Sequence, residues 1–379
     1  MNPKVVAVEP SVIRAINARK KASTIDLGLG EPTLGPTMAF FEAATRSVAE
    51  HGIKYTANAG ATVLREAIVR HYGYRYLDDP AGVCITTGSQ EAVYVAIKAV
   101  LDPLEDELLI VEPAFPVYAK IAQLEGISVT RVQLVGEGFG FNVERILAGL
   151  TPRTRMVAVC SPCNPTGRVM RAQDARRLAL GLRAHREQHG KPVYVLHDEI
   201  YRELMYVEEP GYFGTEYEYT IAVNSLSKSN AVTGLRLGWV AAPVSVAAEI
   251  LKAHTYVTSC ASTYAQYVAA AIFRAGALGE HAQWYKTQRT KVLAALGESG
   301  LEFVVPEGGF YACVKLRDGT NSVAFAQHLI EHADVAAIPG VIFGESLEGW
   351  LRLSWVTSAE RFREGLRRIV AVAAPAKKS

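Results

Sequence analysis

The chain has 379 residues, of which 49% are hydrophobic and 21% are charged, and its formal net charge is +2. This composition is typical of a globular protein long enough for two domains, and the near-neutral charge gives no basis for binding nucleic acid or a membrane. No apolar stretch has the length of a membrane span, no signal-peptide pattern precedes the first helices, and five scattered cysteines indicate a reducing compartment. We therefore expect a cytoplasmic protein.

Short apolar runs alternate with amphipathic helical stretches through the middle of the chain. The runs that predict strands span residues 83–86, 108–111, 127–132, 156–159, 193–196, 221–223 and 238–242. Helical periodicity lies between them at residues 90–101, 116–125 and 173–188. Strands that are apolar on both faces and separated by helices predict an α/β fold, with a mostly parallel sheet between helices.

The last part of the chain has a different pattern. After Pro243 the sequence is mainly helical up to about Ser299. Beyond that point, strands are expected at residues 311–316 and 351–355, and helices at residues 322–332 and 359–373. This mixture predicts a smaller α+β domain.

One lysine stands just after a predicted strand. The apolar run 220–223 leads into Ser225-Leu226-Ser227-Lys228, and Arg236 follows eight residues later. A lysine amine can form a Schiff base with an aldehyde, while hydroxyl groups and a guanidinium can hold a phosphate. Pyridoxal 5'-phosphate (PLP) is a cofactor with both groups. The alternative for so common a pattern is an ordinary surface lysine.

Two other strand ends carry residues suited to a phosphate or a planar ring. Ligands of open parallel sheets bind beyond the carboxyl ends of the strands. Ser89 and Gln90 follow a Thr-Gly turn and open a predicted helix, which favours either a phosphate site or a plain helix cap. Phe115 follows the next strand between two prolines, where it can stack on a ring or pack in the core.

Two further strand ends carry an amide and a carboxylate. Asn164 begins an Asn-Pro-Thr-Gly segment that is at least a turn. Asp198 is followed by Glu-Ile-Tyr and needs a partner if it is buried. A protonated pyridine nitrogen would be such a partner, and Tyr201 lies near enough in sequence to reach the ring oxygen; a helix cap is the alternative for Asp198. The Cys160 and Cys163 pair has no matching second pair, so we expect no metal site there.

Taken in order, these segments resemble the class I and II aminotransferases, the fold type I PLP enzymes typified by aspartate aminotransferase. Further segments of the same pattern are Leu29-Gly30-Glu31-Pro32, Tyr55 with Gly60 and Leu64-Arg65, Pro306 to Tyr311, Pro339 to Gly344, and Leu351-Arg352-Leu353-Ser354. The match runs almost from end to end. It departs from many relatives at Phe115, where they carry Trp or Tyr, and at Thr33, where they carry Asp.

The resemblance implies a role for each of these side chains. Lys228 would bind PLP and shuttle a proton, Asp198 would pair with the pyridine nitrogen, and Asn164 and Tyr201 would bind the ring oxygen. Lys228, Asp198 and Tyr201 would thus be the catalytic residues. Phe115 and Ile200 would lie against the two ring faces. The residues implied to hold the phosphate are Ser89, Gln90, Ser225, Ser227, Arg236 and, from a neighbouring subunit, Tyr55. Arg352 would bind the substrate α-carboxylate, with help from Asn164 and the backbone of Gly30.

The resemblance also implies architecture and reaction. The central sheet would have seven strands in a large domain of residues 41–279, and residues 1–40 and 280–379 would form the small domain with an N-terminal substrate loop. A homodimer would transfer an amino group between an L-amino acid and a 2-oxo acid by a ping-pong mechanism through pyridoxamine phosphate. No second arginine suggests a site for an acidic substrate side chain.

Other functions remain open at this point. The same scaffold supports a C–S β-lyase, a decarboxylase or a specialised biosynthetic PLP enzyme, and sequence motifs separate these poorly. A ligand-sensing transcriptional regulator with this domain would need an added DNA-binding segment, and the Gly30 loop begins too early to leave room for one.

Overall fold

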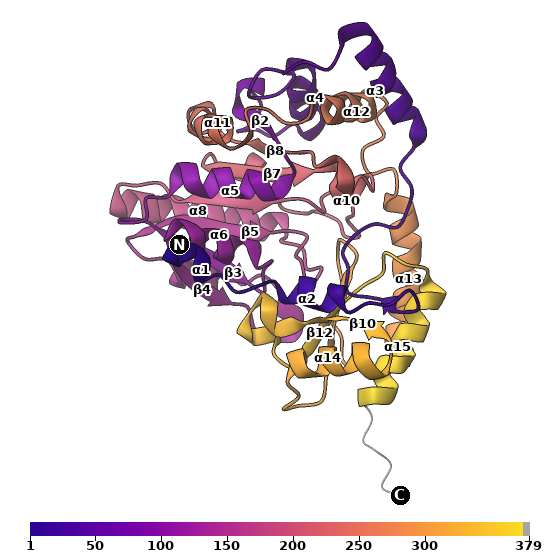
Figure 1. The fold of residues 1–379 in the computed structure, drawn as a ribbon. Helices are drawn as coiled ribbons and strands as arrows, with labels where there is room; N and C mark the ends of the chain where they lie inside the picture. Colours follow the sequence, from indigo (N-terminus) through magenta and orange to yellow (C-terminus); the bar gives the residue numbers. More distant parts are fainter. Residues whose placement is uncertain (374–379) are drawn as a thin grey trace, which may run out of the picture.

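The computed structural model describes residues 1–373, and a seven-stranded sheet forms its centre (Figure 1). Its strands are β2 (Val83–Thr86), β3 (Glu107–Glu112), β4 (Ser128–Gln133), β5 (Thr154–Cys160), β6 (Tyr194–Asp198), β7 (Thr220–Ser225) and β8 (Gly238–Ala241). They lie in the order β2-β8-β7-β6-β5-β3-β4. β8 alone runs opposite to the other six strands, so the expected mostly parallel α/β sheet is confirmed.

The apolar runs of the sequence reflect strands buried on both faces. Along β3, Leu108 and Ile110 pack with α5 (Ser89–Val100), α6 (Val117–Glu125) and α11 (Val244–Thr258). The alternate residues Leu109 and Val111 pack on the other face with α7 (Val143–Ala148) and α8 (Ala172–His189). Because side chains alternate across a strand, helices on both faces require apolar residues at every position.

The reversed direction of β8 follows from its short connection to β7. Residues 226–237 hold only α10 (Leu226–Ser229) and a 3-10 helix, η3 (Thr233–Leu235). A parallel neighbour would need a crossover over the face of the sheet. The start of β8 therefore lies beside the end of β7, and a Cβ added to Gly238 would stand 2.6 Å from the backbone nitrogen of Ser89. This packing brings segments 87–90 and 226–236 to the same edge.

Above the sheet in Figure 1, α3 (Met38–His51), α4 (Thr62–Tyr72) and α12 (Thr263–Arg274) form a helical layer. Leu64 and Ile68 of α4 pack against Trp239 of β8 and Val268 of α12. The sequence pattern predicted no element for α3 or α4. A 3-10 turn, η1 (Pro80–Gly82), then leads from this layer into β2.

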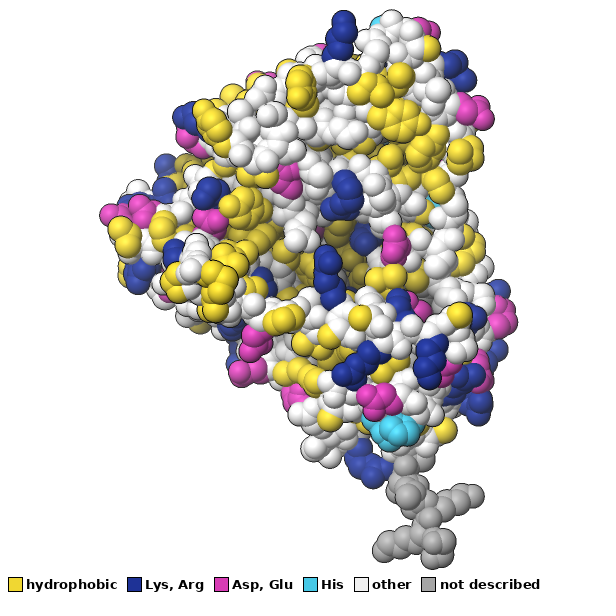
Figure 2. Space-filling view, viewed as in Figure 1, with side chains coloured by type: hydrophobic (Ala, Val, Ile, Leu, Met, Phe, Trp, Pro, Cys, Tyr) yellow, Lys and Arg dark blue, Asp and Glu magenta, His cyan; other side chains and the backbone are white. Residues whose placement is uncertain are grey.

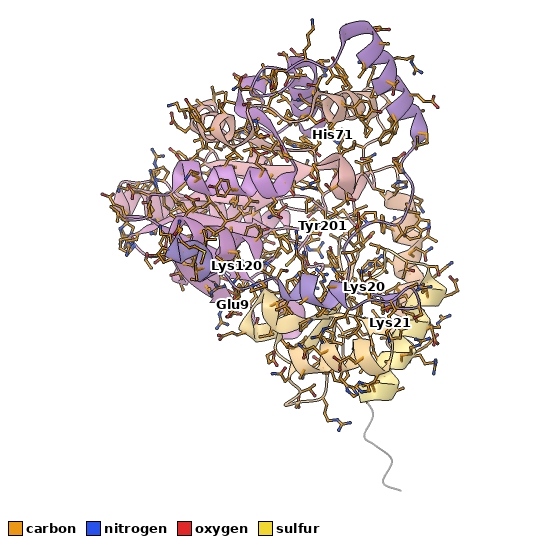
Figure 3. All side chains as sticks on the ribbon, viewed as in Figure 1. Glu9, Lys20, Lys21, His71, Lys120 and Tyr201 are labelled. Carbon is orange, nitrogen blue, oxygen red and sulfur yellow. The ribbon has the colours of Figure 1, made fainter. Side chains whose placement is uncertain are left out.

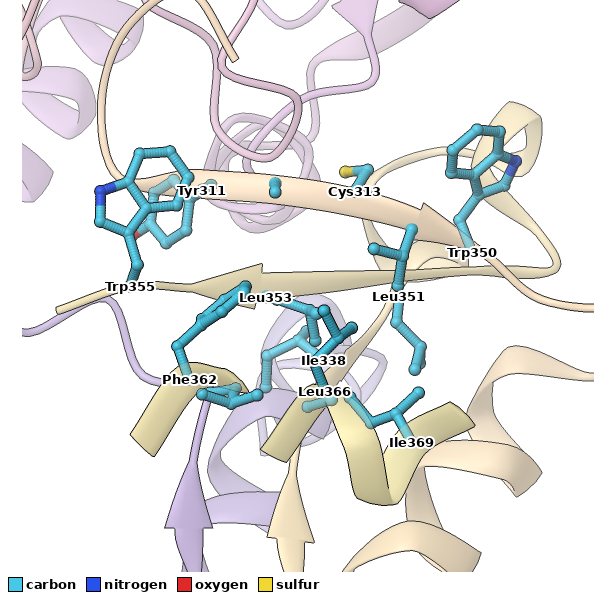
Figure 4. Packing of buried hydrophobic residues seen from close by; sticks show 14 of the residues in the cluster. Tyr311, Cys313, Ile338, Trp350, Leu351, Leu353, Trp355, Phe362, Leu366 and Ile369 are labelled. Carbon is cyan, nitrogen blue, oxygen red and sulfur yellow. The ribbon is translucent and has the colours of Figure 1, made fainter. Parts of the chain in front are cut away.

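Below the large sheet lies a smaller α+β part (Figure 1). Its antiparallel sheet has the order β11-β12-β9, and β1 pairs with β10 in parallel. The strands are β1 (Ile25–Asp26), β9 (Tyr311–Lys315), β10 (Val335–Ala336), β11 (Ile338–Pro339) and β12 (Trp350–Ser354). The helices are α13 (Ala282–Glu298), α14 (Ser322–His332) and α15 (Ala359–Ala373). Phe362, Leu366 and Ile369 recur at helical spacing on α15 and pack against Ile338 and Leu353, as Figure 4 shows.

Short elements complete the chain. They are α1 (Pro3–Val6), α2 (Val12–Ala18), α9 (Phe213–Glu216) and the 3-10 turns η2 (Glu137–Phe139), η4 (Gly340–Phe343) and η5 (Glu345–Leu347). Each strand that the sequence predicted is present, with ends displaced by about two residues at most. Within residues 1–373, no helix combines the length and the apolar character that a membrane crossing requires.

Candidate active site

The carboxyl ends of β2, β5, β6 and β7 meet at one edge of the large sheet. The predicted residues Ser89, Asn164, Asp198 and Lys228 all lie at or just beyond these strand ends. Figure 3 shows Tyr201 in the middle of the molecule, between the large sheet and the smaller α+β part. Figure 2 shows that the molecular surface is hollowed in this region.

Lys228 lies in α10 and is partly buried. Its Nζ donates a hydrogen bond of 2.6 Å to the backbone oxygen of Gly30. Burial lowers the pKa of the amine to about 8, because removal from water disfavours the charged form. Arg352 and Arg236 lower this pKa further, whereas Glu31 and Asp198 oppose the shift. The amine is therefore neutral far more often than that of an ordinary surface lysine.

Asp198 is the last residue of β6 and is buried. The hydroxyl of Tyr118 donates to its Oδ2 at 2.6 Å, and the backbone nitrogen of Ile200 donates to its Oδ1 at 3.2 Å. Burial raises the pKa of Asp198, and these two hydrogen bonds oppose the rise. Among residues 1–373, no lysine or arginine forms a salt bridge with Asp198. A cation that reached this carboxylate would satisfy it.

A group of donors surrounds the start of α5. Gly88 precedes the helix with φ 81°, and Ser89 is the first helical residue, so Ser89 is not the helix cap. The guanidinium of Arg236 lies against Gly88, since a Cβ added there would stand 2.3 Å from Nη2. Ser225 and Ser227, which shortly precede Lys228 in the sequence, are both buried. Ser225 Oγ accepts a hydrogen bond from Ser227 N at 3.1 Å. Helix N–H groups, hydroxyls and a guanidinium together suit a phosphate dianion.

Arg352 lies in β12 and is 2% exposed. Its Nη1 donates to Asn164 Oδ1 at 3.0 Å, and its Nη2 donates to the backbone oxygen of Gly28. The guanidinium stands 4.4 Å from the centre of the Tyr311 ring. In the described chain its Nε has no hydrogen-bond partner. A buried guanidinium with this free donor suits a carboxylate ligand.

The segment around Gly30 lies across the site. The Tyr201 hydroxyl donates to the Tyr311 hydroxyl at 3.1 Å. A Cβ added to Gly30 would stand 1.7 Å from that Tyr311 oxygen, so any larger residue here would displace the Tyr311 ring. Thr233 Oγ1 donates to Glu31 Oε1 at 2.6 Å, which fastens the same segment to the loop that leads to Arg236.

Sequence reasoning missed two tyrosines here, Tyr118 and Tyr311. Tyr118 gave a weak signal, because it follows Phe115 by one helical turn at the end of a buried strand. Tyr311 stood in a matching segment but carried no assigned role. Their contacts depend on elements far apart in sequence, which no local pattern reports.

Other predicted residues are placed as follows. Phe115 and Ile200 are partly buried and pack against the same hydrophobic core as Tyr201. Gln90 is exposed at the start of α5. Tyr55 is 90% exposed. Cys160 and Cys163 are buried free thiols whose pKa values burial raises, an environment typical of unreactive cysteines.

Comparison with known proteins gives the family. The family model described as aminotransferase class I and II matches residues 22–369. The chain belongs to the class I and II aminotransferases. It is 35% identical over 381 residues to a probable N-acetyl-LL-diaminopimelate aminotransferase of Bacillus subtilis, covering 97% of this chain and 94% of that protein. It is 34% identical over 379 residues to an aspartate aminotransferase of Pyrococcus horikoshii, covering 97% and 95%.

Solved structures agree with this membership. The crystal structure of an aspartate aminotransferase from Thermotoga maritima superposes with a TM-score of 0.89 at 31% identity, covering 98% of this chain and 99% of that one. The present aminotransferase is accordingly a PLP-dependent enzyme that transfers amino groups between amino acids and 2-oxo acids. The family, fold class, reaction and cofactor that the sequence predicted are confirmed.

The side chains of this aminotransferase fit the cofactor. Lys228 provides an amine whose pKa is lowered to about 8. Asp198 is a buried carboxylate without a cationic partner in the described part of the chain. Gly88 leaves room against Arg236 where a side chain would collide. These are the groups that an aldehyde, a pyridine nitrogen and a phosphate require.

Proposed function

We propose that this aminotransferase uses Lys228, Asp198 and Tyr201 as its catalytic residues, with an L-α-amino acid and a 2-oxo acid as substrates. The observation that carries the proposal is the Lys228 amine, whose pKa is lowered to about 8 at the edge where Asp198 also lies, with Arg352 of β12 close enough to act on it. When bound, PLP supplies an aldehyde that bonds to amines and a ring that takes up electrons. The chain's own residues provide positioning and proton transfer.

Lys228 moves the proton of the substrate. Once its amine is free, it removes a proton from Cα of the amino acid, because a lysine with pKa about 8 is partly neutral near physiological pH. It would then deliver the proton to the cofactor carbon rather than back to Cα, as transfer of the amino group requires. The 2-oxo acid reacts by the same steps in reverse, and we expect ping-pong kinetics.

Five residues would orient the cofactor ring. Asp198 would keep the ring nitrogen protonated, since a buried carboxylate favours a cationic partner. Asn164 and Tyr201 would donate to the ring oxygen. Phe115 and Ile200 would lie against the two faces. Their support is their common location at the carboxyl edge of the sheet.

The remaining residues would bind the two charged ends. The residues proposed for the phosphate are Ser89, Gln90, Ser225, Ser227, Arg236 and Tyr55 of the partner subunit. Arg352 would bind the substrate α-carboxylate, with Asn164 and the backbone of Gly30 beside it. The free Nε of Arg352 supports this assignment.

A screen of amino donors tests the reaction. The purified protein is incubated with 2-oxoglutarate or pyruvate and with aspartate, N-acetyl-LL-diaminopimelate, and neutral and aromatic amino acids. We expect a new amino acid to form from the acceptor with one of these donors. Release of ammonia with pyruvate would instead indicate β-lysis, and release of carbon dioxide would indicate decarboxylation.

Replacing Tyr118 by phenylalanine should slow catalysis without removing Asp198. The variant loses the donor to Asp198 Oδ2, so the pKa of this aspartate rises further and its ionised form becomes less favoured. A hydrogen bond to a charged group contributes about 1.5–3 kcal/mol. We expect kcat/KM to fall roughly tenfold to a hundredfold.

Tyr94→Phe is the matched control for this substitution. Its hydroxyl donates to Glu125 Oε1 at 2.9 Å, which is also a tyrosine–carboxylate bond but joins α5 to α6. The control should keep wild-type kcat/KM. Equal losses in both variants would show that the Tyr118 effect is general destabilisation.

Arg352→Lys should damage substrate binding and leave the cofactor spectrum unchanged. A lysine keeps the charge but cannot make two parallel hydrogen bonds to a carboxylate. The loss of about 1.5–3 kcal/mol corresponds to roughly a tenfold to a hundredfold decrease in kcat/KM. Arg236→Lys should instead weaken the retention of PLP. Titration of each variant with PLP and then with its best donor separates the two roles, and a reversed outcome would exchange them.

We also propose a homodimer with shared active sites. The side chains of Ile53, Tyr55 and Tyr256 are exposed, and Figure 2 shows hydrophobic surface over α3 and α12. The segment that carries Tyr55 is fastened there by a 2.6 Å bond from Thr263 Oγ1 to the backbone oxygen of Lys54. Such a patch is typical of an interface. Sedimentation should give the mass of two chains, and a monomer with full activity would contradict the proposal.

The division into domains is likewise a proposal. The large domain would comprise residues 41–279, since all strands of the seven-stranded sheet fall within residues 83–241. The small domain would comprise residues 1–40 and 280–379, of which 374–379 lie outside the described residues. Pairing of β1 with β10 supports this grouping. Limited proteolysis should cut between α12 and α13 before it cuts within either sheet.

The proposed location is the cytoplasm. All five cysteines are free, as expected in a reducing compartment. Cell fractionation tests this placement, and recovery from an oxidising compartment would contradict it.

A further inference from the structure

A line of hydrogen bonds leads from Glu203 to the turn that carries Lys228. The Tyr72 hydroxyl donates to Glu203 Oε1 at 2.8 Å, and Asn224 Nδ2 donates to the Tyr72 oxygen at 3.1 Å. Asn224 Oδ1 in turn accepts from the backbone nitrogen of Ser225 at 2.7 Å. Tyr72, Asn224 and Ser225 are all buried. Four groups from α4, β7 and the segment after β6 are thus joined to the start of α10.

Glu203 has few other partners. Its Oε2 is shielded from solvent and has no hydrogen-bond partner among residues 1–373. The neighbouring Arg202 forms its ion pair with Glu199 at 2.9 Å and lies over the rings of Tyr72 and Tyr74, at 4.6 and 4.9 Å from their centres. Glu203 is partly buried, and a carboxyl group removed from water is costly without partners. The hydrogen bond from Tyr72 is therefore an important polar contact of this carboxyl group.

The other end of the lysine turn reaches the same place. Asn230 Nδ2 donates to the backbone oxygen of Ala277 at 2.8 Å, and Asn230 Oδ1 accepts from Gly279 N at 3.4 Å. Gly279 lies directly against Glu203, because a Cβ added to it would stand 2.9 Å from the Glu203 Cβ. Both flanks of Lys228 are therefore linked to Glu203, one through Asn224 and Tyr72 and the other through Asn230 and Gly279.

We propose that Glu203 is a positioning residue for the cofactor site, whose carboxylate fixes the turn bearing Ser225, Ser227 and Lys228 through Tyr72 and Asn224. The proposal rests on the proposed function, since it gives these three residues a cofactor to hold. An ionised acceptor strengthens the Tyr72 bond, and connected hydrogen bonds polarise one another. A fixed turn binds PLP more tightly, because less ordering is needed on binding.

The protonation of Glu203 should make the strength of this line of hydrogen bonds depend on pH. Burial raises the pKa of Glu203 to about 7; the Tyr72 bond and Arg202 oppose the rise, and Glu199 adds to it. The other ionisable groups nearby are His71 on α4, whose pKa is lowered by burial and by Arg202, and Glu280, which accepts from Thr37 Oγ1 at 2.5 Å. Tyr74 and Tyr212 also lie close, and burial and the charge of Glu203 both raise their pKa values. Above pH 7 the carboxylate accepts from Tyr72 at full strength. Below pH 7 it is protonated, and the line weakens.

The test compares Tyr72→Phe with Tyr74→Phe. The two rings are stacked with centres 5.5 Å apart and share Arg202, but Tyr74 donates to Glu199, which has no bond to Asn224. The PLP-free protein is titrated with PLP at pH 8, with cofactor absorbance as the readout. We expect the dissociation constant of Tyr72→Phe to rise about fivefold, the effect of one hydrogen bond, and that of Tyr74→Phe to stay within about twofold of wild type.

Glu203→Gln supplies the second variant and the pH dependence. It keeps the shape of the side chain but cannot ionise. The ratio of its dissociation constant for PLP to that of the wild type should therefore be above one at pH 8 and close to one at pH 6. Lys228 and the PLP phosphate also titrate, but their effect on PLP binding is the same in all variants and cancels in this ratio. A ratio that does not change with pH, or equal losses in Tyr72→Phe and Tyr74→Phe, would overturn the positioning role. Failure of the wild-type protein to bind PLP through Lys228 would instead overturn the proposed function.

Discussion

Replacing Lys228 by alanine should abolish amino transfer in a protein that still folds. The variant loses both the amine that bonds to the cofactor and the base that takes the Cα proton. A positioned general base alone contributes about 100-fold to 10,000-fold to the rate, so we expect kcat to fall by at least about a thousandfold. Circular dichroism and the melting temperature check the fold. Borohydride treatment of the wild type, followed by peptide mapping, should label Lys228, and a label on another lysine would refute its assignment.

The pH dependence of cofactor binding tests the same residue. Burial lowers the pKa of Lys228 to about 8, and only the neutral amine attacks an aldehyde. The rate at which the PLP-free protein takes up PLP should therefore increase as the pH rises from 6 and level off above about 8. An increase that continues to pH 10 would indicate an amine with an ordinary lysine pKa. Lys252, an exposed lysine on α11 paired with Glu249, serves as the control position, and Lys252→Ala should leave the profile unchanged.

Replacing Asp198 by asparagine should slow the Cα proton step by orders of magnitude. The amide keeps the shape and can accept from Tyr118, but it carries no charge to favour a cationic ring nitrogen. Breaking a buried charge pair costs about 3–5 kcal/mol, which corresponds to roughly a 100-fold to 5,000-fold decrease in rate. Stopped-flow kinetics with a Cα-deuterated donor measure this step, and the isotope effect should increase as proton removal becomes slower.

Two further variants serve as controls for Asp198→Asn. Asp198→Glu keeps the charge and should be milder. Asp174→Asn removes an aspartate on α8 whose pKa burial also raises, and it should keep wild-type kcat. A wild-type kcat in Asp198→Asn would make Asp198 a structural residue and leave the strand-end argument without support.

Much of the large sheet could be predicted from the sequence for a physical reason. A strand covered on both faces must be apolar at every position, so its run of residues is visible without any partner. The glycine, asparagine and aspartate residues after these strands were equally visible, because the carboxyl edge needs turn formers and polar groups. The strand at residues 238–242 was predicted but its reversed direction was not, since the direction of β8 depends on the short connection 226–237 rather than on its own residues.

The tyrosine contacts that support the site residues could not be predicted from the sequence. Tyr118 reaches Asp198 across 80 positions of the chain, and Tyr72 reaches Glu203 across 131. A tyrosine on an amphipathic helix has the same local pattern whether it packs in a core or donates to a carboxylate. Helices α3 and α4 were missed as well, since part of their surface remains exposed and their apolar stripes are interrupted.

The pairing of β1 with β10 has a consequence for synthesis of the chain. Ile25 N donates to Asp334 O and Leu27 N to Ala336 O, both at 2.9 Å, while Ser354 N donates to Leu27 O at 2.7 Å. Residues 25–27 therefore cannot form these bonds until residues 334–354 have been made. The large sheet, whose strands end at Ala241, has all of its residues much earlier. Contacts of such long sequence separation form late, so during translation the cofactor edge precedes the pocket that holds Gly30 and Arg352.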